Sequence, residues 1–199
     1  MSGIVGGLNT RGSGLILSSA TDGQVFMATG AGMSAGFEAL ATGGGVLQVK
    51  YGEATAAFST TSSTLTAITG MSVAITPASS SNKILVIAQV GGFSGVGTGF
   101  SQLQLMRDST AIHEGDSAST RDTVSVIHFT ANSSVTFHPT IVDLDDPSST
   151  SEIVYTLHGK CEGSNTLSFN QYFSDTDHAI QGARAASGMM AIEVDSSVL

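Results

Sequence analysis

Apolar residues recur at every second position through most of the chain after Gly45, a spacing typical of β-strands. In 64–76, TLTAITGMSVAIT, the alternation runs in two halves around Gly70, which predicts a bulge or tight bend there. Turn residues separate the apolar runs, as in 77–82 and at Asp108-Ser109. The pattern predicts strands at 46–50, 54–59, 64–76, 83–90, 100–107, 110–113, 123–130, 135–142, 153–160, 166–172 and 189–194.

Regularly spaced short strands with turn residues between them are typical of antiparallel β-sandwiches. We therefore expect an all-β body over residues 45–199, an antiparallel, jelly-roll-like β-sandwich. A helical period is weakly present only at 37–41.

Several predicted strands carry apolar residues on both faces. Leu85 and Ile87 alternate with the equally apolar Ile84 and Val86, and 189–192 repeats the pattern. In a two-layer sandwich one face of each strand normally meets water, so a second apolar face calls for a second covering surface. Packing between subunits supplies one, which predicts a homo-oligomer, with a trimer preferred.

Residues 1–44 differ from the rest of the chain because they are rich in glycine and almost uncharged. Glycine-rich chain loses much backbone entropy on ordering, so it is not expected to fold alone. The sequence predicts an extended anchoring arm that a neighbouring subunit or another protein holds; the alternative is a flexible leader. The apolar side chains available for such anchoring are Leu8, Leu15, Ile16, Leu17, Val25, Phe26, Met27 and Phe37.

Composition and charge narrow the choice of partner. Only 12% of the 199 residues are charged and the net charge is -9, with seven Lys and Arg residues in all. Phosphate binding needs clustered basic residues, so neither nucleic acid nor an anionic membrane is expected as a partner. The single Cys161 cannot form an internal disulfide and is expected in the core or at the surface. Without a secretory or membrane-spanning pattern at 1–19, assembly in a cytoplasm is expected.

No motif predicts catalysis, and no cofactor is expected. Gly91–Phe100, GGFSGVGTGF, follows an apolar strand as a dinucleotide loop does, but its glycine spacing is wrong and no helix pattern follows, so a mobile rim loop is expected. The five histidines, His113, His128, His138, His158 and His178, show no metal-ligand spacing.

Asp143, Asp145 and Asp146 form the most notable acidic cluster, and Asp175 with Asp177 forms a similar pair. Carboxylates that alternate in a loop are possible Ca²⁺ ligands, since Ca²⁺ takes six to eight oxygen atoms. Neither group has the spacing of an EF-hand. Carboxylates solvated in a turn are the favoured interpretation, and calcium is the weaker alternative.

The stretch at 21–40, TDGQVFMATGAGMSAGFEAL, resembles an element of fibre and surface proteins of tailed bacteriophages. The body, with MSVAITPASSSNKILVIAQV, QLQLMRDSTAI and FSDTDHAIQGARAASGMMAIEV, is similar to virion proteins of marine and cyanobacterial phages. The resemblance implies a trimeric β module with an N-terminal attachment segment and no catalytic residues.

Together these observations predict a non-enzymatic virion protein, assembled in the host cytoplasm. It is expected to be a homotrimeric capsid decoration (cement), head-fibre or short spike protein, bound to capsid or tail proteins through its arm. The alternative is a tail-fibre or receptor-binding module that recognises a host surface glycan. Glycan binding requires exposed aromatic side chains, and the only tyrosines are Tyr51, Tyr155 and Tyr172.

Overall fold

The computed structural model describes residues 24–27, 36–39, 45–131, 135–162, 165–172, 175–180 and 182–199. The chain divides into two units, Met1–Gly44 and Gly45–Leu199. In the first unit, β1 (Gln24–Met27) pairs antiparallel with β2 (Gly36–Ala39), so the weak helical pattern at 37–41 gives a strand where it is described. Of the predicted anchoring residues, Leu8, Leu15, Ile16 and Leu17 lie outside the described residues. Val25, Phe26 and Met27 lie in β1 and Phe37 in β2.

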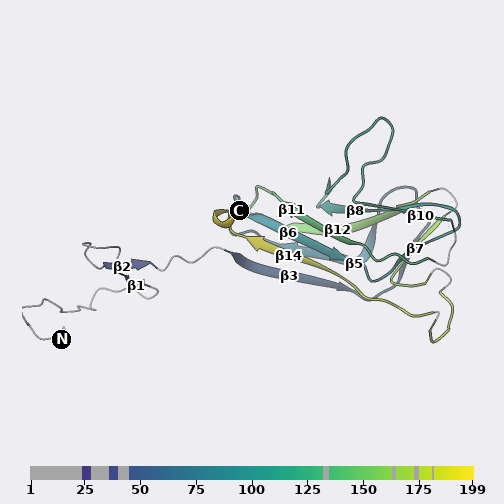
Figure 1. The fold of residues 1–199 in the computed structure, drawn as a ribbon, viewed down its shortest axis with the longest axis horizontal. Helices are drawn as coiled ribbons and strands as arrows, with labels where there is room; N and C mark the ends of the chain where they lie inside the picture. The colour runs from purple at the N-terminus through teal and green to yellow at the C-terminus, as the bar shows by residue number, and fades with distance from the viewer. Residues whose placement is uncertain are drawn as a thin grey trace, which may run out of the picture. The chain divides into compact units, whose positions relative to one another are not determined.

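The second unit is built on two antiparallel sheets (Figure 1). The first sheet, here called sheet A, has the strand order β11 (Thr140–Asp145), β6 (Lys83–Gln89), β14 (Ser187–Val194) and β3 (Val46–Ala54). The second, sheet B, has the order β10 (Val126–Thr130), β8 (Gly99–Arg107), β12 (Ile153–Cys161) and β5 (Thr66–Ile75), with β9 (Thr110–Ile112) paired to β8.

A third sheet of three short strands completes this unit. It has the order β4 (Phe58–Thr60), β13 (Thr166–Phe169) and β7 (Phe93–Val96), and the 3-10 helix η1 (Ser196–Val198) follows β14. All strand pairs in the described residues are antiparallel, so the predicted all-β, sandwich-like fold is confirmed.

The core lies between the sheets, where every second side chain of the long strands is buried. β6 contributes Ile84 and Val86, and β12 contributes Tyr155 and Leu157, all with 0% exposure. This alternation is the pattern that the sequence shows, because successive side chains of a strand point to opposite faces of the sheet.

Two sequence predictions about turns are confirmed. Asp108-Ser109 joins β8 to β9, with Arg107 opposite Thr110 and Asp108 at a left-handed φ of 51°. Gly70 adopts a φ of 85°, and the register between β12 and β5 shifts between Thr156 and His158, opposite this part of β5. The extra residues of β5 around Gly70 form the predicted bulge.

Two predictions from glycine are wrong. Gly52 does not separate two strands, because β3 runs through it; a Cβ there would lie 2.2 Å from the Ser72 carbonyl oxygen, so Gly52 permits close approach of β3 to β5. The segment Gly91–Phe100 is not a rim loop. It forms β7 and the start of β8, and Phe93 and Ser94 are fully buried.

The prediction of a strand at 135–142 is displaced, since β11 begins only at Thr140. Before it, Phe137 forms an isolated bridge with Phe93. The apolar alternation of Val135, Phe137 and Ile141 therefore reflects two different pairings rather than one strand.

Candidate functional site

The outer face of sheet A is apolar across all four strands. The strand register sets two rows of outward side chains, Val142, Ile87, Met190 and Tyr51 in the first and Leu144, Leu85, Ile192 and Val49 in the second. We call these eight residues the apolar face. Figure 1 shows β11, β6, β14 and β3 side by side in this order.

The residues at the two edges of the apolar face are the most exposed. Val142 and Leu144 on β11 are 49% and 50% exposed, and Val49 and Tyr51 on β3 are 51% and 60% exposed. Side chains on the middle strands are half-buried by these neighbours. Both faces of sheet A are therefore apolar, as predicted from Leu85 and Ile87.

Glycine at position 188 shapes one corner of the apolar face. A Cβ on Gly188 would lie 2.5 Å from the Tyr51 hydroxyl oxygen and 2.8 Å from its ring carbon Cε2. The Tyr51 ring therefore lies against the backbone of β14, where any other residue would displace it. Because Gly188 has no side chain, the Tyr51 ring can lie along the sheet and add its area to the apolar face.

The outer face of sheet B has a different character. Its outward positions include Ser72 on β5, Thr156 and His158 on β12, and Gln104 on β8, which is itself covered and 0% exposed. Partial burial lowers the pKa of His158, whose ring nitrogen Nε2 lies 3.1 Å from the Thr156 hydroxyl. This part of sheet B is polar, whereas the exposed apolar side chains of its outer face, Phe100, Ile127 and Phe129, lie on β8 and β10.

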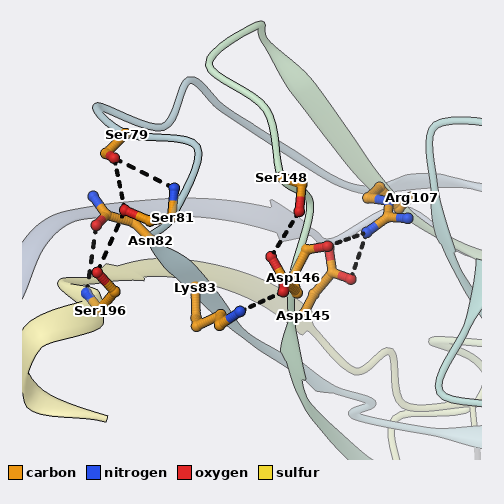
Figure 2. Close-up of polar contacts among 9 residues, drawn as sticks. All are labelled: Ser79, Ser81, Asn82, Lys83, Arg107, Asp145, Asp146, Ser148 and Ser196. Carbon is orange, nitrogen blue, oxygen red and sulfur yellow. Dashed lines mark hydrogen bonds and ion pairs between the residues drawn. The ribbon is translucent and has the colours of Figure 1, made fainter.

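Asp145 joins the two sheets through a buried polar contact. Its Oδ1 accepts a hydrogen bond of 2.7 Å from Arg107 Nη1 on β8, and its Oδ2 accepts one of 2.7 Å from the Tyr155 hydroxyl on β12. Burial, together with the hydrogen bond to Asp145, raises the pKa of Tyr155. Asp145 thus has a structural role, and Figure 2 shows its pairing with Arg107.

The other two residues of the acidic cluster turn to different partners. Asp146 pairs with Lys83 and accepts a hydrogen bond of 3.1 Å from Ser148, as Figure 2 shows. The hydrogen bonds from Lys83 and Ser148 lower the pKa of Asp146. Asp143 lies 3.3 Å from the ring of His113.

The three carboxylates therefore do not converge on a common point where Ca²⁺ could bind. Asp175 of the second acidic pair is bonded to Arg184 at 2.6 Å. Within the described part of the chain, no group of three His, Cys, Asp or Glu side chains is arranged to hold a metal ion.

Cys161 is a core residue, one of the two placements expected from the sequence. It is 3% exposed, and its thiol donates to the carbonyl oxygens of Asn165 at 3.1 Å and Thr60 at 3.4 Å. Burial raises the pKa of the Cys161 thiol, which keeps it protonated and unreactive at neutral pH.

Glu193 is the residue that sequence reasoning missed most clearly. It is fully buried on the inner face of β14 and accepts hydrogen bonds from Asn82 Nδ2 at 2.6 Å, Gln48 Nε2 at 2.6 Å and the Ala78 amide at 2.7 Å. Burial alone would raise its pKa, but these donors outweigh burial and lower it. The only sequence signal is one acidic residue in an apolar strand, GMMAIEV.

Neither a protein-family model nor a curated protein matches the chain. None of the helical segments in the described residues has the length and hydropathy needed to cross a bilayer. The class of protein is therefore defined by the fold and the site alone, as an all-β, sandwich-like protein with an apolar outer sheet face.

Proposed function

We propose that the protein is a non-enzymatic structural component of a tailed-bacteriophage virion. In this proposal it is a homotrimeric decoration or short spike protein that attaches to the particle through residues 1–44. The observation that carries the proposal is the apolar face of sheet A, because such a surface favours burial against another protein.

The size of the apolar face is that of the apolar centre of a subunit contact rather than of a whole interface. Four strands lie about 4.8 Å apart, so two rows of apolar side chains spanning them cover a continuous patch of roughly 200–300 Å². A stable interface needs about 800 Å² per partner, so this patch would form the apolar centre of a larger contact.

Charge supports a second copy of the chain as the occupant. The protein is acidic, with a net charge of -9, so copies repel one another through most surfaces. The apolar face carries no charged side chain in either row. Two copies can therefore meet here without placing like charges in contact.

The arrangement of the most exposed residues supports a ring. Val142 and Leu144 lie at one edge of the apolar face and Val49 and Tyr51 at the other. Each edge can serve a different neighbour, as a closed ring of three subunits requires. A twofold dimer would instead bring the same patch of both copies together.

We also propose that the sandwich is jelly-roll-like, and the strand order supports this. The eight principal strands, in chain order, are β3, β5, β6, β8, β10, β11, β12 and β14. Sheet A holds the first (β3), third (β6), sixth (β11) and eighth (β14) of them. Sheet B holds the second (β5), fourth (β8), fifth (β10) and seventh (β12). This alternation supports the proposal, because a jelly roll, a fold used in viral capsid and lectin domains, divides its strands between two sheets.

A second candidate function is host attachment as a tail-fibre or receptor-binding module. The observation that favours it is a group of exposed aromatic side chains on sheet B, with Phe100 41% and Phe129 51% exposed. Attachment and decoration differ in what the particle loses when the protein is absent: host binding in the first case and particle stability in the second.

Deletion of residues 1–42 is expected to leave a folded body that does not join the particle, because the body keeps its core while the proposed anchor is lost. The measurement is co-purification of tagged full-length and truncated protein with virus particles. Circular dichroism of the truncated protein provides the control for folding. Equal incorporation of both proteins would refute the anchoring role of the segment.

A further inference from the structure

A hollow of about 390 Å³ opens on the outer side of sheet B, away from the apolar face. Adjacent strands form its floor, since Gln102 on β8 is paired with Ile127 on β10 and with Lys160 on β12. The long loop that follows β9 (Figure 1) contributes Asp122, and Glu162 follows β12. A volume of this size falls in the range of small-molecule sites.

One wall of the hollow is aromatic. The rings of Phe100 and Phe129 lie 4.9 Å apart at 49°, and Phe100 lines the hollow together with Ile127. Phe100 is 41% and Ile127 58% exposed. An exposed aromatic ring beside a concave surface offers a flat platform for the C–H groups of a ligand.

The remaining lining is polar and rich in acceptors. Asp122 is bonded to Lys160 at 2.9 Å, and Glu162 Oε2 accepts the Phe100 amide at 3.2 Å. The hydrogen bond and charge of Lys160 lower the pKa of Asp122, so this carboxylate is ionised at neutral pH. Hydroxyl groups of a ligand can donate to Asp122 and Glu162.

Gln102 supplies the most specific indication of a ligand. Its side-chain oxygen Oε1 is buried and has no hydrogen-bond partner among the described residues, although Gln102 lines the hollow. A buried polar atom without a partner costs free energy, which a donor bound in the hollow would recover when the Gln102 amide turns towards it.

We propose that this hollow is a binding site for a neutral saccharide, with one sugar ring stacked on Phe100 and its hydroxyl groups bonded to Gln102, Asp122 and Glu162. A sugar has one face of C–H groups and a rim of hydroxyl donors, which matches an aromatic wall beside acceptor side chains. Two carboxylates against one lysine, in a chain of net charge -9, disfavour an anionic sugar. The inference deepens the second candidate function, host attachment, and does not depend on the trimeric decoration role.

The test is saturation-transfer NMR and titration of the full chain with methyl glycosides of glucose, galactose, mannose and N-acetylglucosamine. At least one is expected to bind with a dissociation constant of roughly 0.1–10 mM. Phe100→Ala is expected to weaken this binding about 5–10-fold through lost stacking. Asp122→Asn, which keeps the shape of the side chain, is expected to weaken it about 5-fold.

The matched control is Tyr51→Ala, which removes an exposed aromatic ring from the other sheet and is expected to leave saccharide binding unchanged. Equal weakening by Tyr51→Ala and Phe100→Ala would overturn the assignment, as would absence of transfer to every glycoside. Preference for N-acetylneuraminic acid would contradict the neutral class. Transfer to a phenylalanine-containing tripeptide but to no glycoside would assign the hollow to a peptide instead.

Discussion

Glu193→Ala is expected to lower the free energy of unfolding by about 3–5 kcal/mol, because it leaves three neutral donors without an acceptor, each at a cost of about 1–3 kcal/mol where it is buried. Gln48 comes from β3, and Ala78 and Asn82 come from the turn before β6, so the carboxylate ties two segments to β14. Urea unfolding at neutral pH measures the change. The control is Glu152→Ala, at an exposed position before β12, for which a change within about 0.5 kcal/mol is expected.

The same carboxylate predicts a pH dependence. The folded protein lowers the pKa of Glu193 below its ordinary 4.5, so the unfolded chain binds a proton at a higher pH than the folded protein does. The stabilisation is therefore complete above the ordinary pKa and is lost as the pH falls through the folded pKa. Glu193→Gln is expected to flatten the loss of stability below about pH 4.5. An unchanged acid slope would contradict the role given to the charge.

Leu144→Glu and Val49→Glu are each expected to dissociate the proposed oligomer. Either substitution places an unpaired carboxylate in the proposed interface, which should raise the dissociation constant at least about 100-fold. Both positions are about half exposed within one chain, so the fold should be retained. Sedimentation velocity measures the mass of each variant, and circular dichroism checks that it is folded.

The matched control for these variants is Ser72→Glu, which places the same carboxylate on the exposed outer face of sheet B. It is expected to leave the mass unchanged. Dissociation by Ser72→Glu as strongly as by Leu144→Glu would mean that added charge alone, not its position on the apolar face, separates the copies.

The strands and the second apolar face could be predicted from the sequence because both depend on local alternation. Leu85 and Ile87 share a strand with Ile84 and Val86, so their opposite faces follow from the two-residue period alone. β6 and β12 begin where the sequence predicts, at Lys83 and Ile153.

Features that depend on contacts between distant segments could not be predicted in this way. Gly52 reads as a strand break, yet it permits close packing against Ser72. The sequence also shows three nearby carboxylates as one acidic cluster, at 143, 145 and 146. In the structure each carboxylate has a different partner from another part of the chain: His113 for Asp143, Arg107 for Asp145 and Lys83 for Asp146.

The hollow on sheet B was missed for the same reason. Phe100, Asp122 and Lys160 lie in different segments of the sequence and meet only after β8, β10 and β12 have paired. The rings beside the hollow are phenylalanines, which the sequence pattern does not distinguish from core residues.

The central claim is that the apolar face of sheet A is covered by further copies of the same chain. Sedimentation equilibrium of the full-length protein tests this claim most directly. We expect a mass of about three times the 20.2 kDa of one chain, independent of loading concentration in the micromolar range. A mass of 20.2 kDa at every concentration would contradict the claim.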